Sequence, residues 1–210
     1  MRKTFDGQLA QLHSELAQLG ALCEQAIAKA ARAFLSGDAP LAAEVQEHAA
    51  QIDRREREVE TLCLKLLLRQ QPVAADLRVI SAALKMVTDM ERIGNQSADI
   101  ADIVQKSAPP AQGETYSEMA RGVIFMVDES VDAFLHADTE KARSVIAYDD
   151  VVDGAFLRVK DELIARIRAA DPCSANAADL LMVAKYLERI GDHAVNIAKW
   201  VVFSVTGELG

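Results

Sequence analysis

The sequence predicts an all-α protein made of two repeated antiparallel three-helix bundles packed side by side, six long helices in all. Ala and Leu dominate its hydrophobic half, aromatic residues make up only 5%, and glycine and proline are few, a profile that suits helix interiors. The phrase Glu-Arg-Ile-Gly occurs at 91–94 and again at 188–191, and the neighbouring residues match at the same spacing. Internal similarity of this length indicates one structural unit used twice.

The first half contains the periodicity of three helices. From Gln8 onward the apolar residues follow the 3-4 spacing of a long bundle helix, which we expect to end near Gly37, before a helix start at 38–40. Pro72 marks the next break, and a third helix is expected from about residue 73 to about 105. The proline- and glycine-containing segment 107–113 is interpreted as the linker, so the predicted repeats are 1–107 and 113–210.

The second half repeats this plan. Thr115 and Glu118 have the spacing of a capping box, which predicts that the fourth helix starts there with side-chain caps. A break at 136–139 opens the fifth helix. Asp171 and Pro172 separate the fifth helix from the sixth, which is expected to end near Gly207.

Charge and cysteine usage exclude several classes of protein. The formal charge of −9 argues against nucleic acid or anionic lipid as a direct partner. Three cysteines without Cys-x-x-Cys spacing indicate a reduced compartment. The start of the chain lacks a signal peptide's apolar stretch, and no run approaches the roughly 18 apolar residues that a membrane helix requires. We therefore expect a cytoplasmic protein that does not insert into the membrane.

One carboxylate stands where a helical bundle favours an apolar residue. Asp149 falls on the apolar seam of the fifth helix, and Asp153 lies one turn away on the same side. A buried carboxylate needs a partner. The sixth helix adds oxygen-bearing side chains at four-residue steps, namely Glu188, Asp192 and Asn196. If the two helices face each other, these groups form an oxygen-rich shell suited to Mg²⁺, Ca²⁺, Mn²⁺ or oxo-bridged iron.

Other interpretations of the same residues remain open. Acids at four-residue spacing also occur on any solvated helix face, which would leave a purely structural scaffold. A carboxylate-bridged metal enzyme usually calls for Glu-x-x-His on two helices, a pattern absent from the motif helices here. We interpret Arg92 and Arg189 as ion-pair partners of nearby acids, and Gly94 and Gly191 as points of close helix approach. No Gly-rich phosphate loop, His-Glu-x-x-His or nucleophile-elbow pattern is present, so no enzymatic activity is expected.

The motifs at 91–95, 148–153 and 187–198 together resemble those of the PhoU family, phosphate-uptake regulators built from two three-helix repeats. The resemblance extends over nearly the whole chain. It implies a cytoplasmic negative regulator of the phosphate-starvation response and of phosphate uptake. Such a protein links the ATPase subunit of the phosphate ABC transporter to a sensor histidine kinase, and we also expect it to form a homodimer.

The resemblance also implies bound metal ions, with iron, zinc, manganese and magnesium as candidates. Its acidic motifs correspond here to Asp149, Asp153, Glu188, Asp192 and Asn196 in the second half, and to Asp53, Glu91, Asn95 and Asp99 in the first. The first set departs from the family pattern, because Ala49 stands where an acid is usual and Asn95 replaces an aspartate. We therefore expect the first site to bind metal more weakly than the second, or not at all.

Overall fold

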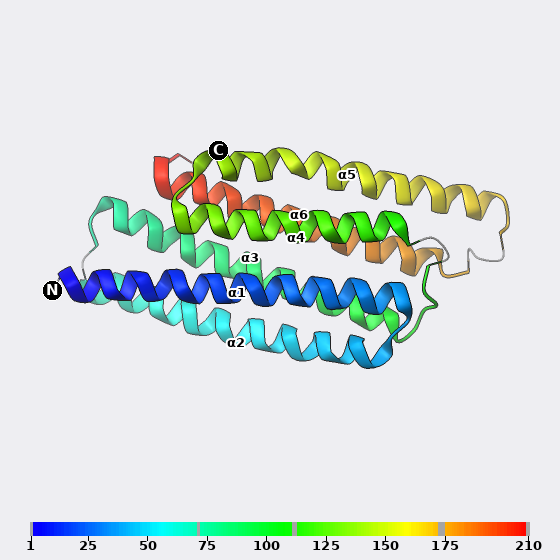
Figure 1. The fold of residues 1–210 in the computed structure, drawn as a ribbon, viewed down its shortest axis with the longest axis horizontal. Coiled ribbons are helices and arrows are strands. Elements are labelled where there is room, and N and C mark those ends of the chain that lie inside the picture. The colour runs from blue at the N-terminus through cyan, green and yellow to red at the C-terminus, as the bar shows by residue number, and fades with distance from the viewer. Residues whose placement is uncertain (1, 71, 111–112, 172–174, 209–210) are drawn as a thin grey trace.

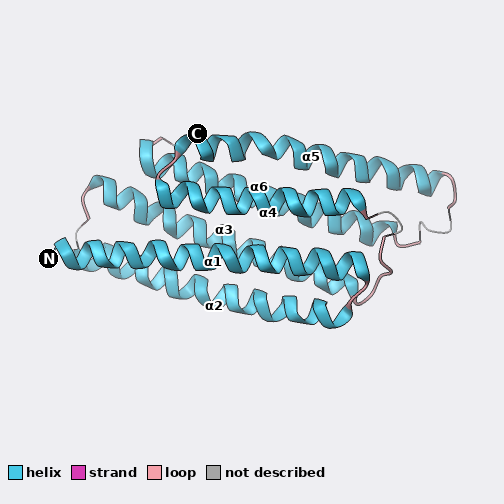
Figure 2. Cartoon of the chain, viewed as in Figure 1, coloured by secondary structure: helices cyan, strands magenta, loops and turns pink. Residues whose placement is uncertain are grey.

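The computed structural model describes residues 2–70, 72–110, 113–171 and 175–208, and within these ranges it contains six α-helices and no strand (Figure 2). In chain order the helices are α1 Arg2–Ser36, α2 Ala39–Gln70, α3 Ala74–Val104, α4 Glu114–His136, α5 Thr139–Arg168 and α6 Ala177–Thr206. The predicted fold class is therefore confirmed. None of the described helices combines the length and apolarity that a membrane-spanning segment needs.

Consecutive helices run antiparallel, so that the molecule is a long bundle with all helix axes roughly aligned (Figure 1). Helices α1, α2 and α3 pack on one another, and so do α4, α5 and α6. The two trios meet through α3 against α6 and α1 against α4, which leaves α2 and α5 on the outer sides (Figure 1). One continuous apolar core joins both trios. The predicted boundary between the repeats 1–107 and 113–210 therefore stays a prediction. It does not divide the apolar core into two.

The helix seams account for this core. The predicted seam of α1 starts at the partly buried Leu9 and is fully buried from there on: Leu12, Leu16, Leu19, Cys23, Ala26 and Ala30. Each large apolar side chain moved out of water in this way stabilises the fold by roughly 1.5–3 kcal/mol. Helices α3 and α6 carry buried residues on a larger part of their surface than α2 and α5, because they pack both within their own trio and against the other one.

The same turn is used twice, once in each trio. After α1, Gly37 adopts a left-handed conformation (φ 68°), and the Asp38 carboxylate accepts a hydrogen bond from the Leu41 amide at 2.9 Å. After α4, Ala137 takes the left-handed position (φ 53°), and Asp138 caps α5. A glycine suits this backbone conformation and an aspartate satisfies a free amide of the next helix, so the predicted breaks at both places are confirmed.

We expect Asp138→Ala to destabilise the protein by about 1 kcal/mol, because the Lys141 amide at 3.0 Å loses its acceptor. Urea denaturation monitored by circular dichroism measures this change. The matched control is Asp161→Ala, an exposed aspartate in the C-terminal third of α5, which should be neutral or slightly stabilising. Equal effects of the two substitutions would contradict a capping role for Asp138.

The start of α4 differs from the sequence prediction. The helix begins at Glu114, Gly113 occupies the N-cap position, and no side chain caps it, so the capping-box prediction is wrong. Thr115 already lies inside the first turn, where its hydroxyl cannot reach the free amides, and the Gly113 carbonyl instead accepts from the Ser117 amide at 3.0 Å. Helix α1 also begins at Arg2, earlier than its apolar pattern indicates. Pro172 lies outside the described residues.

Candidate functional site

Asp149 sits in the middle of α5 with its carboxylate directed at α6. The side chain is half-buried, and its Oδ1 atom is buried without a hydrogen-bond partner among the described groups. Gly191 of α6 lies opposite: a Cβ atom built there would stand 3.2 Å from Oδ1 and 3.6 Å from a methyl group of Val152. The glycine of the second Glu-Arg-Ile-Gly phrase thus leaves room for the carboxylate, as close approach of the two helices requires.

Acidic neighbours surround Asp149 from both helices. Burial contributes most to raising the pKa of Asp149, and the negative charges of Asp153, Asp192, Glu188 and Asp150 follow, bringing that pKa to about 6. A carboxyl group in this environment favours either a proton or a cation. Helices α5 and α6 therefore face each other at Asp149, as the predicted cation site requires.

The neighbours of Asp149 differ in how they are held. Glu188 is only 13% exposed and forms an ion pair with Lys185, one turn earlier on α6. The Lys185 ammonium also lies 5.5 Å from the centre of the Phe156 ring, which holds it between α5 and α6. Asp153 and Asp192 are exposed, and neither has an ion pair or hydrogen bond to any described residue.

Asn196, the last member of the predicted set, is engaged with the other trio. Its amide donates to Oδ1 of Asp89 on α3 at 3.3 Å, and Nδ1 of His193 donates to the same oxygen at 2.9 Å. Two steps of four residues rotate a side chain by about 80° around a helix, so Asn196 faces α3 while Glu188 faces α5. As a ligand beside Asp149, Asn196 stays a prediction.

In the first trio the equivalent place is apolar. Ala49 stands where α5 has Asp149, and a Cβ atom on Gly94 would lie 3.0 Å from Cδ1 of the fully buried Ile52. Gly94 thus permits close packing of hydrocarbon, whereas its counterpart in α6 accommodates a carboxylate. The interpretation of both glycines as points of close approach is confirmed.

Three of the first-half candidates, Asp53, Glu91 and Asn95, have hydrogen-bond partners within the chain. Both carboxylate oxygens of Asp53 accept from Nη2 of Arg57, at 3.1 and 2.9 Å. Glu91 accepts from the Asn95 amide at 2.7 Å and lies 3.4 Å from Nε of Arg92, which confirms the ion-pair interpretation of that arginine.

Asp99 faces α6 and not Glu91. Burial raises its pKa, Asp102 raises it further, and Arg189 of α6 opposes both effects. Asp99 and Asn196 occupy equivalent positions in the repeated phrase, and each is turned towards the helix of the other trio. They serve the contact between α3 and α6 in this structure.

Sequence reasoning missed an acid on α2. Burial raises the pKa of Glu56, and the charges of Glu60, Glu91 and Asp53 add to the rise, so Glu56 lies between α2 and α3. The signal was present in the sequence, because Glu56 falls on the apolar seam of α2 just as Asp149 falls on that of α5.

The donor chemistry of the second trio fits a hard cation. Asp149 supplies a buried oxygen without a partner, and Asp153 and Asp192 are free to rotate towards it. In their present rotamers, however, no three His, Cys, Asp or Glu side chains of the described residues form a metal-coordinating group. Binding a metal would therefore require side-chain rotations on α5 and α6, with the helices held in place by the core.

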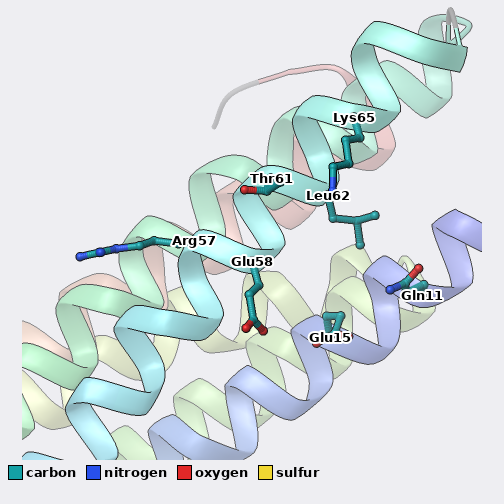
Figure 3. Close-up of a pocket in the computed structure, with 7 residues that line it drawn as sticks. All are labelled: Gln11, Glu15, Arg57, Glu58, Thr61, Leu62 and Lys65. Carbon is teal, nitrogen blue, oxygen red and sulfur yellow. The ribbon is translucent and has the colours of Figure 1, made fainter.

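An open groove of about 450 Å³ lies between α1 and α2, well apart from Asp149. Figure 3 shows Gln11 and Glu15 on one side and Glu58, Leu62 and Lys65 on the other. Its mixed lining and the pairing of Glu15 with Arg55 at 2.9 Å give no convergent set of ligand groups. None of the predicted metal ligands lines it.

Comparison with known proteins gives consistent matches over the whole chain. Residues 16–104 and 116–201 each match the family described as "PhoU domain", once per trio. A Clostridium acetobutylicum protein named "Phosphate-specific transport system accessory protein PhoU homolog" is 34% identical, covering 99% of this chain and 96% of its own length. A Pseudomonas aeruginosa protein of the same name is 33% identical over 97% of this chain and 86% of its own.

Solved structures agree with the fold as well as with the sequence. The crystal structure of PhoU from Pseudomonas aeruginosa has a TM-score of 0.91 and 33% identity, covering 97% of this chain and all of that one. The phosphate transport system regulatory protein PhoU from Streptococcus pneumoniae reaches the same TM-score at 27% identity, covering 98% and 99%. The relatives are named as accessory and regulatory proteins and not as enzymes, in agreement with the sequence expectation. With both trios matched separately and the full length shared, this chain belongs to the PhoU family.

Proposed function

We propose that this protein is an accessory protein of a phosphate-specific transport system. In this role it represses phosphate uptake and the phosphate-starvation response from the cytoplasm. It acts as an adaptor that docks on the ATPase subunit of the phosphate ABC transporter and on a sensor histidine kinase. The observation that carries the proposal is the near-complete mutual coverage with relatives of that name, because a shared fragment alone would not support a shared role.

A pull-down from cells grown with and without phosphate tests the adaptor role. The tagged protein should recover the transporter ATPase and a histidine kinase, and the recovered amounts should differ between the two conditions. An unrelated tagged helical protein of similar charge is the control. Recovery of neither partner under either condition would contradict the proposal.

We further propose that Asp149, Asp153, Glu188 and Asp192 hold a metal ion between α5 and α6. The bound ion would supply positive charge to a group of carboxylates that otherwise repel one another. The support is the partnerless, buried Oδ1 atom of Asp149 together with the charges around it. Oxygen ligands alone are compatible with iron, manganese or magnesium, and zinc also accepts carboxylates.

We expect Asp192→Ala to lower the metal content of the purified protein by more than half, because it removes both a ligand and a negative charge. Elemental analysis of the variant beside the wild-type protein measures the change. The control is Asp161→Ala, an exposed aspartate elsewhere on α5. Unchanged metal content in Asp192→Ala would count against the second-trio site.

A further inference from the structure

Two of the predicted acidic ligands of the first trio, Asp53 and Glu91, already have donors from the same chain. Asp53 receives two hydrogen bonds from Arg57, and Glu91 receives one from Asn95 and faces the Arg92 guanidinium with its other oxygen. All four oxygen atoms of these two predicted ligands therefore have a donor close by. A metal ion would have to displace these donors or bind beside them.

The second trio lacks the same donors. By the repeat correspondence, Leu157 stands in place of Arg57, and Asp192 in place of Asn95. Asp153, the counterpart of Asp53, consequently has no arginine one turn further along its helix. Its carboxylate, like that of Asp192, has no ion pair or hydrogen bond within the part of the chain that the structure describes.

We propose that Arg57 and Asn95 are internal substitutes for a cation, which close the first trio to metal and restrict the chain to one metal site. This inference rests on the proposed metal binding in the second trio. It assigns to Arg57 a role that its position on an exposed helix face would not suggest. Arg57 also lines the edge of the groove between α1 and α2, and Figure 3 shows its side chain pointing away from Gln11 and Glu15 of α1.

The local charges agree with this assignment. In the first trio, Asp53, Glu56 and Glu91 face two guanidinium groups, and the place of Asp149 is taken by Ala49. In the second trio, the Lys185 ammonium pairs with Glu188, and the charges that act on Asp149 are all negative. An exposed ion pair such as Asp53 with Arg57 contributes little to stability. Its positive charge nevertheless stays within one helical turn of the carboxylates and repels a second cation.

Moving the arginine into the second trio tests the inference. Leu157→Arg places a guanidinium four residues after Asp153, and the replaced side chain is 49% exposed, so the fold should tolerate it. We expect the affinity of the chelator-treated protein for Mn²⁺, measured by calorimetry, to fall by about tenfold or more. Ile164→Arg, at an exposed position two turns further along α5, adds the same charge and should change the affinity less than about twofold.

The reverse exchange uses two variants that differ only at residue 57. With Ala49→Asp and Asn95→Asp in both, a second equivalent of Mn²⁺ should bind when Arg57→Leu is added and not when Arg57 is kept. The inference is overturned if both variants or neither gain the second equivalent, or if Leu157→Arg binds like wild type. No binding of Mn²⁺ to the wild-type protein would instead remove the proposed metal site itself, so the two failures are distinguishable.

Discussion

Asp149→Asn is expected to stabilise the metal-free protein at neutral pH while abolishing metal binding. The substitution keeps the shape of the side chain but removes a charge that is half-buried near four other carboxylates. Allowing for the part of the side chain that water reaches, relief of this repulsion and desolvation should add about 1–2 kcal/mol to the free energy of unfolding. Metal binding should be lost because the buried ligand oxygen no longer belongs to an anion.

The gain in stability should depend on pH in a defined direction. The carboxyl group of Asp149 has a pKa of about 6 in the folded protein against an ordinary value of 3.8. Because the folded pKa is raised, the group contributes stability that is fully present below pH 3.8 and is lost as the pH rises through about 6. The asparagine variant should therefore equal wild type near pH 4 and exceed it at pH 7.5.

Urea denaturation with a chelator present, at pH 4 and pH 7.5, measures this difference. Asp192→Asn removes a charge from the same group at an exposed position and is the matched control, expected to be nearly neutral. A variant that is less stable than wild type at pH 7.5, or one whose gain is the same at both pH values, would show that the charge of Asp149 does not destabilise the folded protein.

The sequence predicted features that depend on one helix at a time. The seam of α1 from Leu12 to Ala30 and the left-handed Gly37 follow from residue spacing and local backbone preference, and the structure contains both. Asp149 was recognisable for the same reason, since an acid on an apolar seam stands out within its own helix. The capping role predicted for Thr115 is wrong because many short segments satisfy a capping pattern, and the N-cap position is occupied two residues earlier by Gly113.

Contacts between two helices could not be predicted from the residue spacing within either helix. The side chains of Asp89 and Asn196 look like members of exposed polar faces until α3 is placed against α6. The prediction of Asn196 beside Asp149 assumes that residues at four-residue steps lie on one line along the helix. The helix repeat of 3.6 residues turns the third member of such a ladder towards another neighbour. Which neighbour that is depends on how the two trios pack, and the repeat pattern alone leaves this open.

The close contact between α2 and α3 leads to the largest stability change that we expect. Ile52 is fully buried and packs on Gly94, so Ile52→Ala should destabilise the protein by about 2–5 kcal/mol through lost burial and the resulting cavity. Gly94→Ala alone should also destabilise, by about 1–2 kcal/mol, because a Cβ atom 3.0 Å from Cδ1 of Ile52 outweighs the gain in helix propensity.

The sign of the glycine substitution should reverse once Ile52 is shortened. In the Ile52→Ala background the new methyl group enters the vacated space, so Gly94→Ala should recover about 1 kcal/mol through packing and helix propensity together. Gly154→Ala is the control, since the nearest atom to its added Cβ is an arginine tip at 3.9 Å, and it should stabilise in both backgrounds. Denaturation midpoints of wild type and the five variants, namely Ile52→Ala and the two glycine substitutions in each background, give the coupling. If Gly94→Ala stabilises the wild-type protein as Gly154→Ala does, then the first Glu-Arg-Ile-Gly glycine is not retained for helix packing, and the repeated phrase needs another physical reason.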